Sequence, residues 1–275
     1  MVDGKELAAG NPQDVCREVR SDDSLVVADS HGRRLIFCRL YDDQLRLTDV
    51  ALVDGRPSGV CQASDGCYYV SNYCRNTMIK VTRGGESAVV MKLANRELAG
   101  PKGLATLPND ESTLLVAESR RACVSLVDLR QNTIVMSFGR EVGQSKLRLD
   151  SPQYLAVFND STTVACSDFY NHCVLLFDLR APRVAPRTAG AFGVGEGQFH
   201  GPTGVAVDEQ TDSLFVSDWG NGRVQQLAKD GTFTSFLCQP NSVNGPQGLQ
   251  SLREFVVVCD SGNKRCVLVR KANES

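Results

Sequence analysis

The chain has 275 residues, of which 42% are apolar and 23% are charged, which is enough apolar sequence for a substantial core and disfavours the disordered and fibrous classes. Thirty basic and 32 acidic residues give a net charge of −2, which argues against a uniformly basic nucleic-acid coat. The longest apolar runs are about five residues, far below the roughly 18 that a membrane helix needs, so we expect no membrane contact.

The first ten residues and the cysteines indicate in which cellular compartment the protein is expected. Residues 1–10 contain Asp3, Lys5 and Glu6 and no apolar block, so we expect no export signal. The 11 cysteines are an odd number with no Cys-x-x-Cys pair, and several lie in apolar runs where a free thiol acts as a small hydrophobe. We therefore predict a reducing, cytoplasmic environment and neither a disulfide framework nor a zinc module.

A repeated unit runs through the whole chain. Each unit has a proline turn, a short apolar strand, an acidic turn, a second apolar strand that closes on a polar residue, and a third strand. The units open at Pro12, Pro57, Pro101, Pro152, Pro202 and Pro246. Their second strands close at Asp29, Asn72, Glu118, Asp168, Asp218 and Asp260. Helical periodicity is absent from this pattern, so it predicts an all-β chain.

Six units of roughly 40 to 50 residues, each with about four strands, predict a six-bladed β-propeller. The expected blades of this single domain are 11–54, 55–98, 99–149, 150–199, 200–243, and 244–275 together with 1–10. The last unit lacks its fourth strand, and residues 1–10 are left over at the other end. If they pair, the ring closes and both strand edges are satisfied, which an open solenoid would leave exposed.

One unit carries a specific motif. Residues 192–208 read FGVGEGQFHGPTGVAVD, residues 214–224 read LFVSDWGNGRV, and together they resemble an NHL repeat. The other units share its frame but are degenerate. The Asn and Arg of its turn are both present only at Asn221 with Arg223 and at Asn263 with Arg265, and blades two and three have neither.

The chain as a whole is similar to the C-terminal propeller of tripartite-motif (TRIM) NHL proteins. The resemblance implies a recognition domain, with RING, B-box and coiled-coil parts elsewhere. Any ubiquitin-ligase chemistry and oligomerisation through the coiled coil would then belong to those parts. It also implies RNA binding on one rim of the ring.

That rim, which we call the first rim, carries the turns after each second strand. These turns hold five Lys or Arg and no acid, whereas the first turns, on the opposite second rim, are rich in Asp and Glu. Arg and Lys neutralise phosphates, exposed aromatics stack on unpaired bases, and Asn reads base edges. The candidate RNA-binding or ligand-binding residues are Arg33, Tyr73, Arg75, Lys102, Arg120, Arg121, Phe169, Tyr170, Asn171 and His172.

Other polar positions are better explained by structure. Arg34, Arg223 and Arg265 occupy the repeat's own Arg position, where we expect them to tie neighbouring blades together through carboxylates. Asp29, Asp168, Asp218 and Asp260 are expected to cap turns by accepting backbone N–H bonds. Trp219 is expected to pack more than to stack on bases.

Two functions remain open. The first is a domain that binds single-stranded or structured RNA for post-transcriptional regulation, with modest and salt-sensitive affinity because the pI is near 6.0. The second is a protein-substrate recognition module of an E3 ubiquitin ligase, because Arg and aromatic clusters also form protein interface hot spots.

Catalysis is not expected. His31, His172 and His200 fall on the first rim away from the axis, and no carboxylate or nucleophile pattern accompanies them. The glycines of 193–197 lack the Lys-Ser/Thr and the helix of a phosphate loop. We therefore predict no enzyme activity, no cofactor and no metal. The link 139–150, with Arg140, Lys146 and Arg148, is expected to extend the basic rim.

Overall fold

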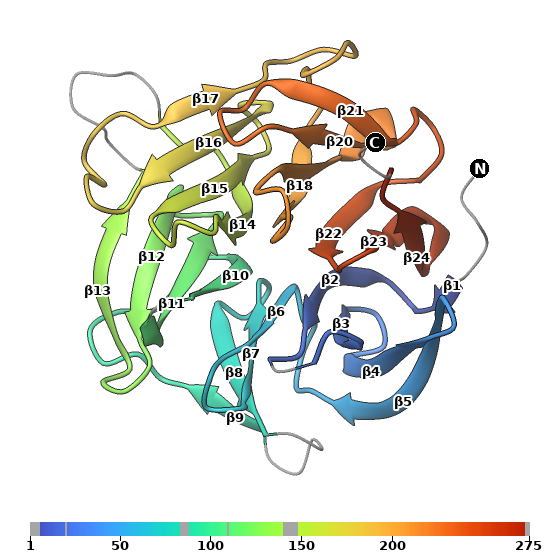
Figure 1. Cartoon of the computed structure of the whole chain (residues 1–275). Coiled ribbons are helices and arrows are strands. Elements are labelled where there is room, and N and C mark those ends of the chain that lie inside the picture. The colour runs from blue at the N-terminus through green and yellow to red at the C-terminus, as the bar shows by residue number, and fades with distance from the viewer. Residues whose placement is uncertain (1–5, 20, 83–87, 109, 140–147, 273–275) are drawn as a thin grey trace.

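The structure, a computed structural model, describes residues 6–19, 21–82, 88–108, 110–139 and 148–272. Six four-stranded antiparallel sheets stand like blades around one axis (Figure 1). The predicted all-β, six-bladed propeller is confirmed. Within the described residues, no helix is long and apolar enough to cross a membrane.

The innermost strands form a closed ring in which each contacts the next around the axis. They are β2 (Pro12–Arg17), β6 (Gly59–Gln62), β10 (Pro101–Leu107), β14 (Pro152–Val157), β18 (Pro202–Val207) and β22 (Pro246–Ser251). The second strands follow outward and end on the predicted polar residues. They are β3 (Ser24–Asp29), β7 (Tyr68–Asn72), β11 (Asp110–Glu118), β15 (Thr163–Asp168), β19 (Leu214–Asp218) and β23 (Phe255–Asp260).

The third strands return from the first rim, and two of them follow a single 3₁₀ turn. They are β4 (Arg34–Tyr41), β8 (Thr77–Val81), β12 (Cys123–Asp128), β16 (Cys173–Asp178), β20 (Arg223–Leu227, after η1, Trp219–Asn221) and β24 (Arg265–Arg270, after η2, Ser261–Asn263). The outermost strands of blades one to six are β5 (Gln44–Leu52), β9 (Ala88–Met91), β13 (Thr133–Phe138), β17 (Arg187–Ala189), β21 (Phe233–Cys238) and β1 (Glu6–Ala8).

The N-terminal strand closes the ring, as predicted. β1 pairs antiparallel with β24, with Glu6 opposite Val267, Leu7 opposite Cys266 and Ala8 opposite Arg265. The sixth blade therefore has the strand order β1-β24-β23-β22 and combines the two ends of the described chain. Pairing removes the free edge that β24 would otherwise present.

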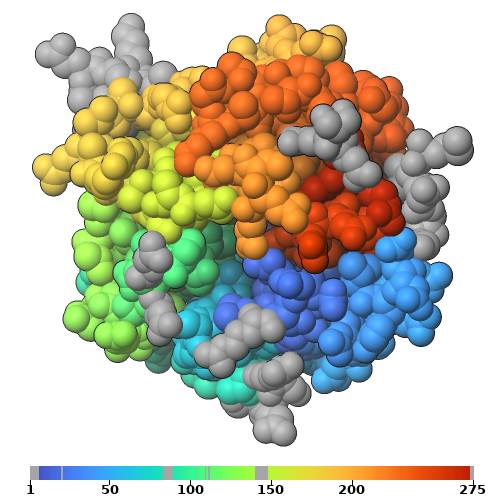
Figure 2. Space-filling view, viewed as in Figure 1, coloured from blue at the N-terminus to red at the C-terminus, as the bar shows by residue number. Residues whose placement is uncertain are grey.

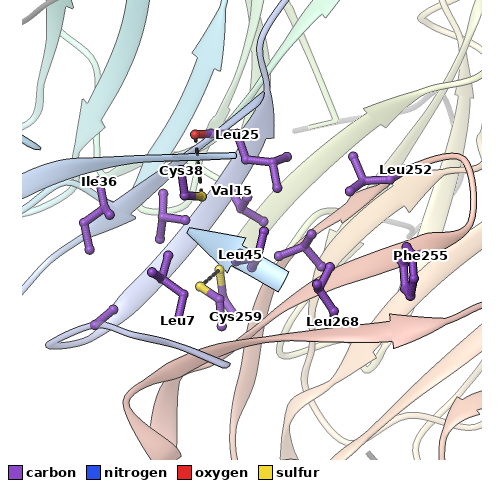
Figure 3. Packing of buried hydrophobic residues seen from close by; sticks show 14 residues of the cluster. Leu7, Val15, Leu25, Ile36, Cys38, Leu45, Leu252, Phe255, Cys259 and Leu268 are labelled. Atoms are coloured by element: carbon purple, nitrogen blue, oxygen red, sulfur yellow. Dashed lines mark hydrogen bonds between the residues drawn. The ribbon is translucent and has the colours of Figure 1, made fainter. Parts of the chain in front are cut away.

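The core lies between blades rather than on the axis. The buried apolar residues form six clusters, one between each pair of neighbouring blades. Successive strand residues serve opposite clusters: Tyr68 packs between blades one and two, and Tyr69 between blades two and three. Both strand faces are thus buried, which explains the uninterrupted apolar runs in the second strands, such as Leu25–Ala28 and Phe255–Cys259. Figure 3 shows the cluster that joins blade six to blade one.

Neighbouring innermost strands approach each other closely near their first-rim ends. At Gly103 a Cβ atom would lie 2.5 Å from the Cα of Tyr154, so only glycine permits this approach of β10 to β14. The Tyr154 hydroxyl crosses from blade four and lies 2.7 Å from the carbonyl oxygen of Gln13 and 3.1 Å from that of Ser58. Figure 2 shows one face of the ring, hollowed where the blades converge.

Candidate nucleic-acid interface

The first rim is built from six four-residue turns that join second to third strands. In every turn the fourth residue adopts the left-handed backbone conformation, with φ between 51° and 58°. Only one of these positions is glycine; they are Arg33, Asn76, Ala122, His172, Gly222 and Lys264. This backbone conformation is sterically unfavourable for residues other than glycine. Other contacts must therefore stabilise each turn.

The strand-closing residues supply those contacts. In five blades the closing carboxylate accepts the backbone N–H of the residue two before the blade's opening proline. The pairs are Gly10 to Asp29 at 3.1 Å, Ala99 to Glu118 at 2.8 Å, Asp150 to Asp168 at 2.8 Å, His200 to Asp218 at 2.7 Å and Asn244 to Asp260 at 2.7 Å. The predicted capping role is confirmed. In blade two the direction reverses, because the Asn72 amide donates to the carbonyl of Asp54 at 3.3 Å.

The repeat's arginines complete the same network. Arg223 is 1% exposed, donates from Nε to Asp218 at 2.8 Å, and donates to the carbonyls of Val194, Gly195 and Gln198. Arg34 and Arg265 make the same Nε contact to Asp29 and Asp260. The structural assignment is confirmed with one change. Each carboxylate belongs to the arginine's own blade, and for Arg223 it is the carbonyls of the preceding loop that bind the blades together.

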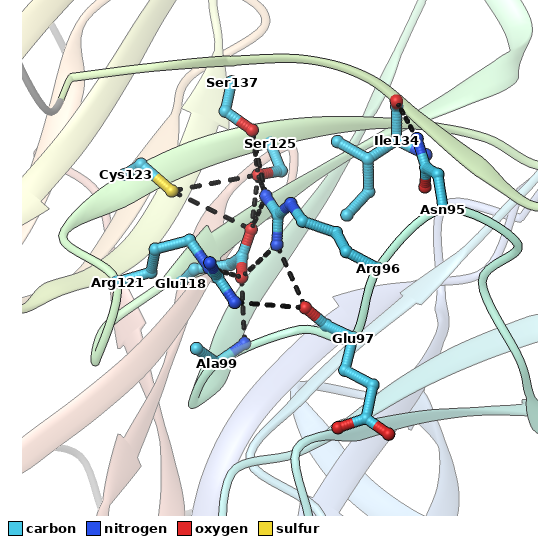
Figure 4. Close-up of polar contacts among 10 residues, drawn as sticks. All are labelled: Asn95, Arg96, Glu97, Ala99, Glu118, Arg121, Cys123, Ser125, Ile134 and Ser137. Atoms are coloured by element: carbon cyan, nitrogen blue, oxygen red, sulfur yellow. Dashed lines mark hydrogen bonds and ion pairs between the residues drawn. The ribbon is translucent and has the colours of Figure 1, made fainter.

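Blade three replaces the missing turn arginine with one from the loop before it. Arg96 donates from Nη1 to the Glu118 carboxylate at 2.9 Å and from Nη2 to the hydroxyls of Ser125 and Ser137 (Figure 4). Burial alone would raise the pKa of Glu118, but the bonds from Arg96 and Ser125 hold it below its ordinary value. Arg96 lies outside the repeat's motif, and so the sequence pattern does not reveal it.

Blade four has no arginine in this network, and this changes the pKa of its closing carboxylate, Asp168. Cys173 stands where blades one, five and six have Arg34, Arg223 and Arg265. Asp168 keeps its bonds from Asn171 and from the Asp150 N–H, but burial raises its pKa to about 7. In blade one, where Arg34 is present, the pKa of Asp29 is lowered despite burial.

Three of the candidate residues meet between blades two and three. The Arg120 guanidinium lies 4.4 Å from the centre of the Tyr73 ring, and the Lys102 ammonium lies 5.3 Å from it. Arg120 also donates to the Asn76 side chain at 3.1 Å and remains exposed. Desolvation lowers the pKa of Lys102, and no ion pair to it occurs within the described chain. We call Tyr73, Lys102 and Arg120 the basic cluster.

Aromatic rings gather on the same rim at blades four and five. Phe169 packs edge-on against Tyr170 at 5.1 Å and against Trp219 at 5.8 Å, measured between ring centres. Tyr170 is 62% exposed and Trp219 is 44% exposed. We call Phe169, Tyr170 and Trp219 the aromatic cluster. In this cluster Phe169 packs against two rings that remain exposed. Trp219 is therefore less buried than we expect from the sequence.

The ring system continues into a loop that the sequence did not single out as a binding element. His172 lies 4.8 Å from Phe192, and Phe192 lies 5.4 Å from His200. His172 Nδ1 accepts the Gly201 N–H at 3.0 Å. Phe192 is 64% exposed and Val194 is 77% exposed. The glycines around them lie in the connection between β17 of blade four and β18 of blade five, and this connection does not account for two exposed apolar side chains.

The other candidates are not brought into these clusters. Arg75 forms an exposed ion pair with Asp54. Arg121 donates to Glu118 at 3.2 Å, and Asn171 donates to Asp168 at 2.7 Å and to the carbonyl of Arg148. Arg33 is exposed in blade one, and among the described residues it forms no ion pair.

Two charge estimates from the sequence change as a result. The first rim also contains the loops before the opening prolines, and Asp54 in one of these loops partly neutralises the positive charge of this rim by pairing with Arg75. Arg121 is a structural residue that shares the Glu118 carboxylate with Arg96. Of the link residues expected to add positive charge, Arg148 is exposed, while Arg140 and Lys146 lie outside the described residues.

The larger cavities do not involve the ten candidate residues. One of about 370 Å³ is lined by all six innermost strands, including Asp14, Cys61 and Tyr154. Another, of about 920 Å³, lies against blades five and six and is lined by Asp208, Phe215 and Lys271 among others. Within the described ranges, no group of three or more His, Cys, Asp or Glu is placed to hold a metal ion.

Comparison with known proteins identifies the repeat and agrees with the fold. The NHL repeat family model matches residues 199–227, so the chain carries an NHL repeat in blade five of a six-bladed propeller. No curated protein matches the sequence.

Solved structures share the fold at low identity. An auxiliary nutrient binding protein from Bacteroides thetaiotaomicron is 13% identical with a TM-score of 0.75, over 95% of this chain and 69% of that one. A gluconolactonase from Xanthomonas campestris is 15% identical with a TM-score of 0.73, over 96% and 86%. A virginiamycin B lyase from Staphylococcus aureus is 11% identical with a TM-score of 0.62, over 97% and 98%.

These neighbours correct one prediction. The sequence led us to expect no enzyme activity, and that exclusion is wrong, because the same propeller carries a lyase and a gluconolactonase. It relied on three histidines and on motifs of other folds, whereas residues on any blade of a ring can be used for catalysis. At 11 to 15% identity these likenesses concern the fold and do not make this chain an enzyme.

Proposed function

We propose that the first rim binds RNA with unpaired bases, as the recognition domain of a TRIM-NHL-type protein in post-transcriptional regulation. The observation that supports this most directly is the presence of both the basic cluster and the aromatic cluster on that rim. Cations for phosphates and supported rings for bases are the two elements that single-strand recognition combines.

The basic cluster suits a nucleotide. Arg120 lies over the Tyr73 ring with its planar guanidinium exposed, so a base can stack on it while a phosphate accepts its N–H groups. Lys102 adds an ammonium without a carboxylate partner in the described chain. An incoming phosphate therefore meets two cations without first breaking an ion pair.

The aromatic cluster suits a second, unpaired base. Tyr170 is exposed and its position is set by Phe169, which Trp219 supports from the other side. Because these rings are already packed, little side-chain entropy is lost when a ligand binds. Each stacked base contributes about 1–3 kcal/mol of binding free energy.

A protein substrate of an E3 ligase remains the second candidate, and one observation favours it. Phe192 and Val194 extend the aromatic cluster with exposed apolar surface. Exposed apolar surface of this kind is typical of protein interfaces.

The test is binding of the chain to a randomised single-stranded RNA pool at two salt concentrations. With Arg33, Lys102 and Arg120 as phosphate contacts, we expect the logarithm of affinity to fall with that of salt at a slope of about −2. Arg120→Glu and Tyr170→Ala should each weaken binding about tenfold or more. Arg130→Glu, at an exposed position on the second rim, makes the same charge change and should have little effect.

Absence of enrichment at low salt would refute RNA binding. Capture of a protein client that depends on Phe192 and Val194 would then support the second candidate. Equal loss of RNA binding in Arg120→Glu and Arg130→Glu would show attraction by overall charge and not by this surface.

A further inference from the structure

Two cysteines face each other at the point where the ring closes. Cys259 on β23 is directly opposite Cys266 on β24, both side chains lie in the cluster between blades six and one, and their Sγ atoms are 3.9 Å apart (Figure 3). Opposite residues of antiparallel strands have Cβ atoms about 4.5–5.5 Å apart, and a disulfide needs about 3.5–4.5 Å. A strand shift of about one ångström is therefore enough to join them.

We propose that Cys259 and Cys266 form an oxidisable site that hydrogen peroxide or a similar small thiol oxidant converts to a disulfide, with access controlled by β1. With peroxide, one thiolate attacks an oxygen, the O–O bond breaks, and a sulfenic acid and water form. The second thiol displaces water from the sulfenic sulfur and the S–S bond forms. Two thiols lose two electrons and two protons, and one peroxide becomes two water molecules.

Cys266 is the thiol that reacts first. β24 lies between β1 and β23, so in the described part of the chain its outer edge is paired with a strand of three residues, β1. Leu7 pairs directly with Cys266 and packs in the same cluster. Cys259 lies one strand further in, between β22 and β24, and is placed to resolve the sulfenic acid.

The closed ring protects both thiols. Each is fully buried, and burial raises the pKa of Cys259 well above its ordinary value. While β1 is paired, burial keeps the oxidant away from both sulfur atoms, and the raised pKa also keeps Cys259 in its unreactive thiol form. β1 has only three residues and is held at its start by a partly exposed Glu6–Arg265 ion pair, so we expect it to open at a low free energy.

Cys38 is the competing partner. It lies in the same cluster on β4 of blade one, and burial raises its pKa to about 12. Its Sγ lies 3.7 Å from the Leu25 carbonyl within its own blade. A Cys38–Cys266 bridge would join two blades, whereas a Cys259–Cys266 bridge joins two strands that are already paired, so the second requires the smaller movement.

The experiment uses the chain with Cys74→Ser, which removes the exposed thiol. The protein is treated with hydrogen peroxide, blocked with N-ethylmaleimide and digested with trypsin, which cuts at Lys264 and Arg265 between the two cysteines. We expect a cross-linked peptide pair containing Cys259 and Cys266. Blocked thiols at both positions after denaturation, or a dominant Cys38–Cys266 link, would overturn the proposal.

Two further variants test the control by β1. Leu7→Ala should speed cross-linking by about tenfold or more, because weaker packing increases the population of the open state. Leu176→Ala removes a buried leucine of the same size from the cluster between blades four and five. Equal acceleration in both variants would show global unfolding, and an unchanged rate in Leu7→Ala would show that β1 does not gate the site.

Discussion

Arg223 is a fully buried cation, and its surroundings explain how a charge is tolerated there. Its guanidinium is bonded to one carboxylate and three carbonyl oxygens, so most of its donors have acceptors. A buried charge is stable only when it is paired and hydrogen-bonded. Arg223 therefore fixes the loop 193–198 to blade five and is part of the scaffold that presents Phe192 and Val194.

Removal of the Arg223 side chain should strongly destabilise the folded protein. Arg223→Ala leaves Asp218 buried without its cation, and we expect the free energy of unfolding to fall by about 3–5 kcal/mol, measured by urea denaturation. Arg120→Ala, at an exposed position, should change it by less than about 1 kcal/mol. A stable Arg223→Ala variant that has lost RNA binding would instead place Arg223 in the binding surface.

Asp168 should make stability depend on pH. Its pKa is raised to about 7 in the folded state, while the unfolded chain releases this proton near pH 4. Between these values the folded state holds a proton that the unfolded state lacks, so this contribution to stability is lost as pH rises from about 4 to 7.

The variant Asp168→Asn cannot titrate, and we expect it to remove this decline. At pH 5 the substitution should cost about 1 kcal/mol, because the bond from Asn171 is lost. By pH 8 the cost should shrink or vanish, as measured by melting temperature across the range. Asp218→Asn is the comparison, since it leaves Arg223 without its carboxylate and should be destabilising at both pH values. A constant cost for Asp168→Asn would contradict a protonated Asp168.

At the scale of the element, β1 is the piece on which closure depends. Deleting residues 1–10 removes the strand paired with β24 and uncovers the cluster that contains Leu268 and Cys266. We expect a loss of about 2 kcal/mol or more from Leu7 alone, together with faster hydrogen exchange in β23 and β24. Glu6→Ala removes only a partly exposed ion pair and should cost less than about 1 kcal/mol. Exchange that quickens equally in all blades would contradict a local role for β1.

The elements were largely predictable because the repeat is periodic. The opening prolines and closing acids of the sequence coincide with the starts of the innermost strands and the ends of the second strands in most blades; β6 starts two residues after Pro57. The site was less predictable, because some of its ion pairs join residues that are remote in sequence. Arg96 binds Glu118 from 22 residues away and shares it with the nearby Arg121, and Arg75 is paired with Asp54, 21 residues away. A turn's composition shows how many cations it contains but not which of them are already paired.

At the scale of the molecule, the two rims differ in chemistry, and RNA should therefore protect only one. On addition of RNA, we expect slower hydrogen exchange in the first-rim turns 73–76, 119–122, 169–172 and 219–222, because a bound strand shields exposed N–H groups. The second-rim turns at 158–163 and 208–213 should not change. Arg120→Glu should abolish the effect, and protection confined to the second rim would contradict the assigned face.

The tyrosine at the axis affects how the ring transmits strain. In a circular array each blade contacts its two neighbours, so a local perturbation should fade with distance along the series. The Tyr154 hydroxyl instead reaches Gln13 on the far side, which links blade four to blade one across the diameter. Mutations in blade one and in blade four should therefore change the free energy of unfolding non-additively when Tyr154 is present. In Tyr154→Phe their effects should add, because the direct contact between the two opposed blades is lost.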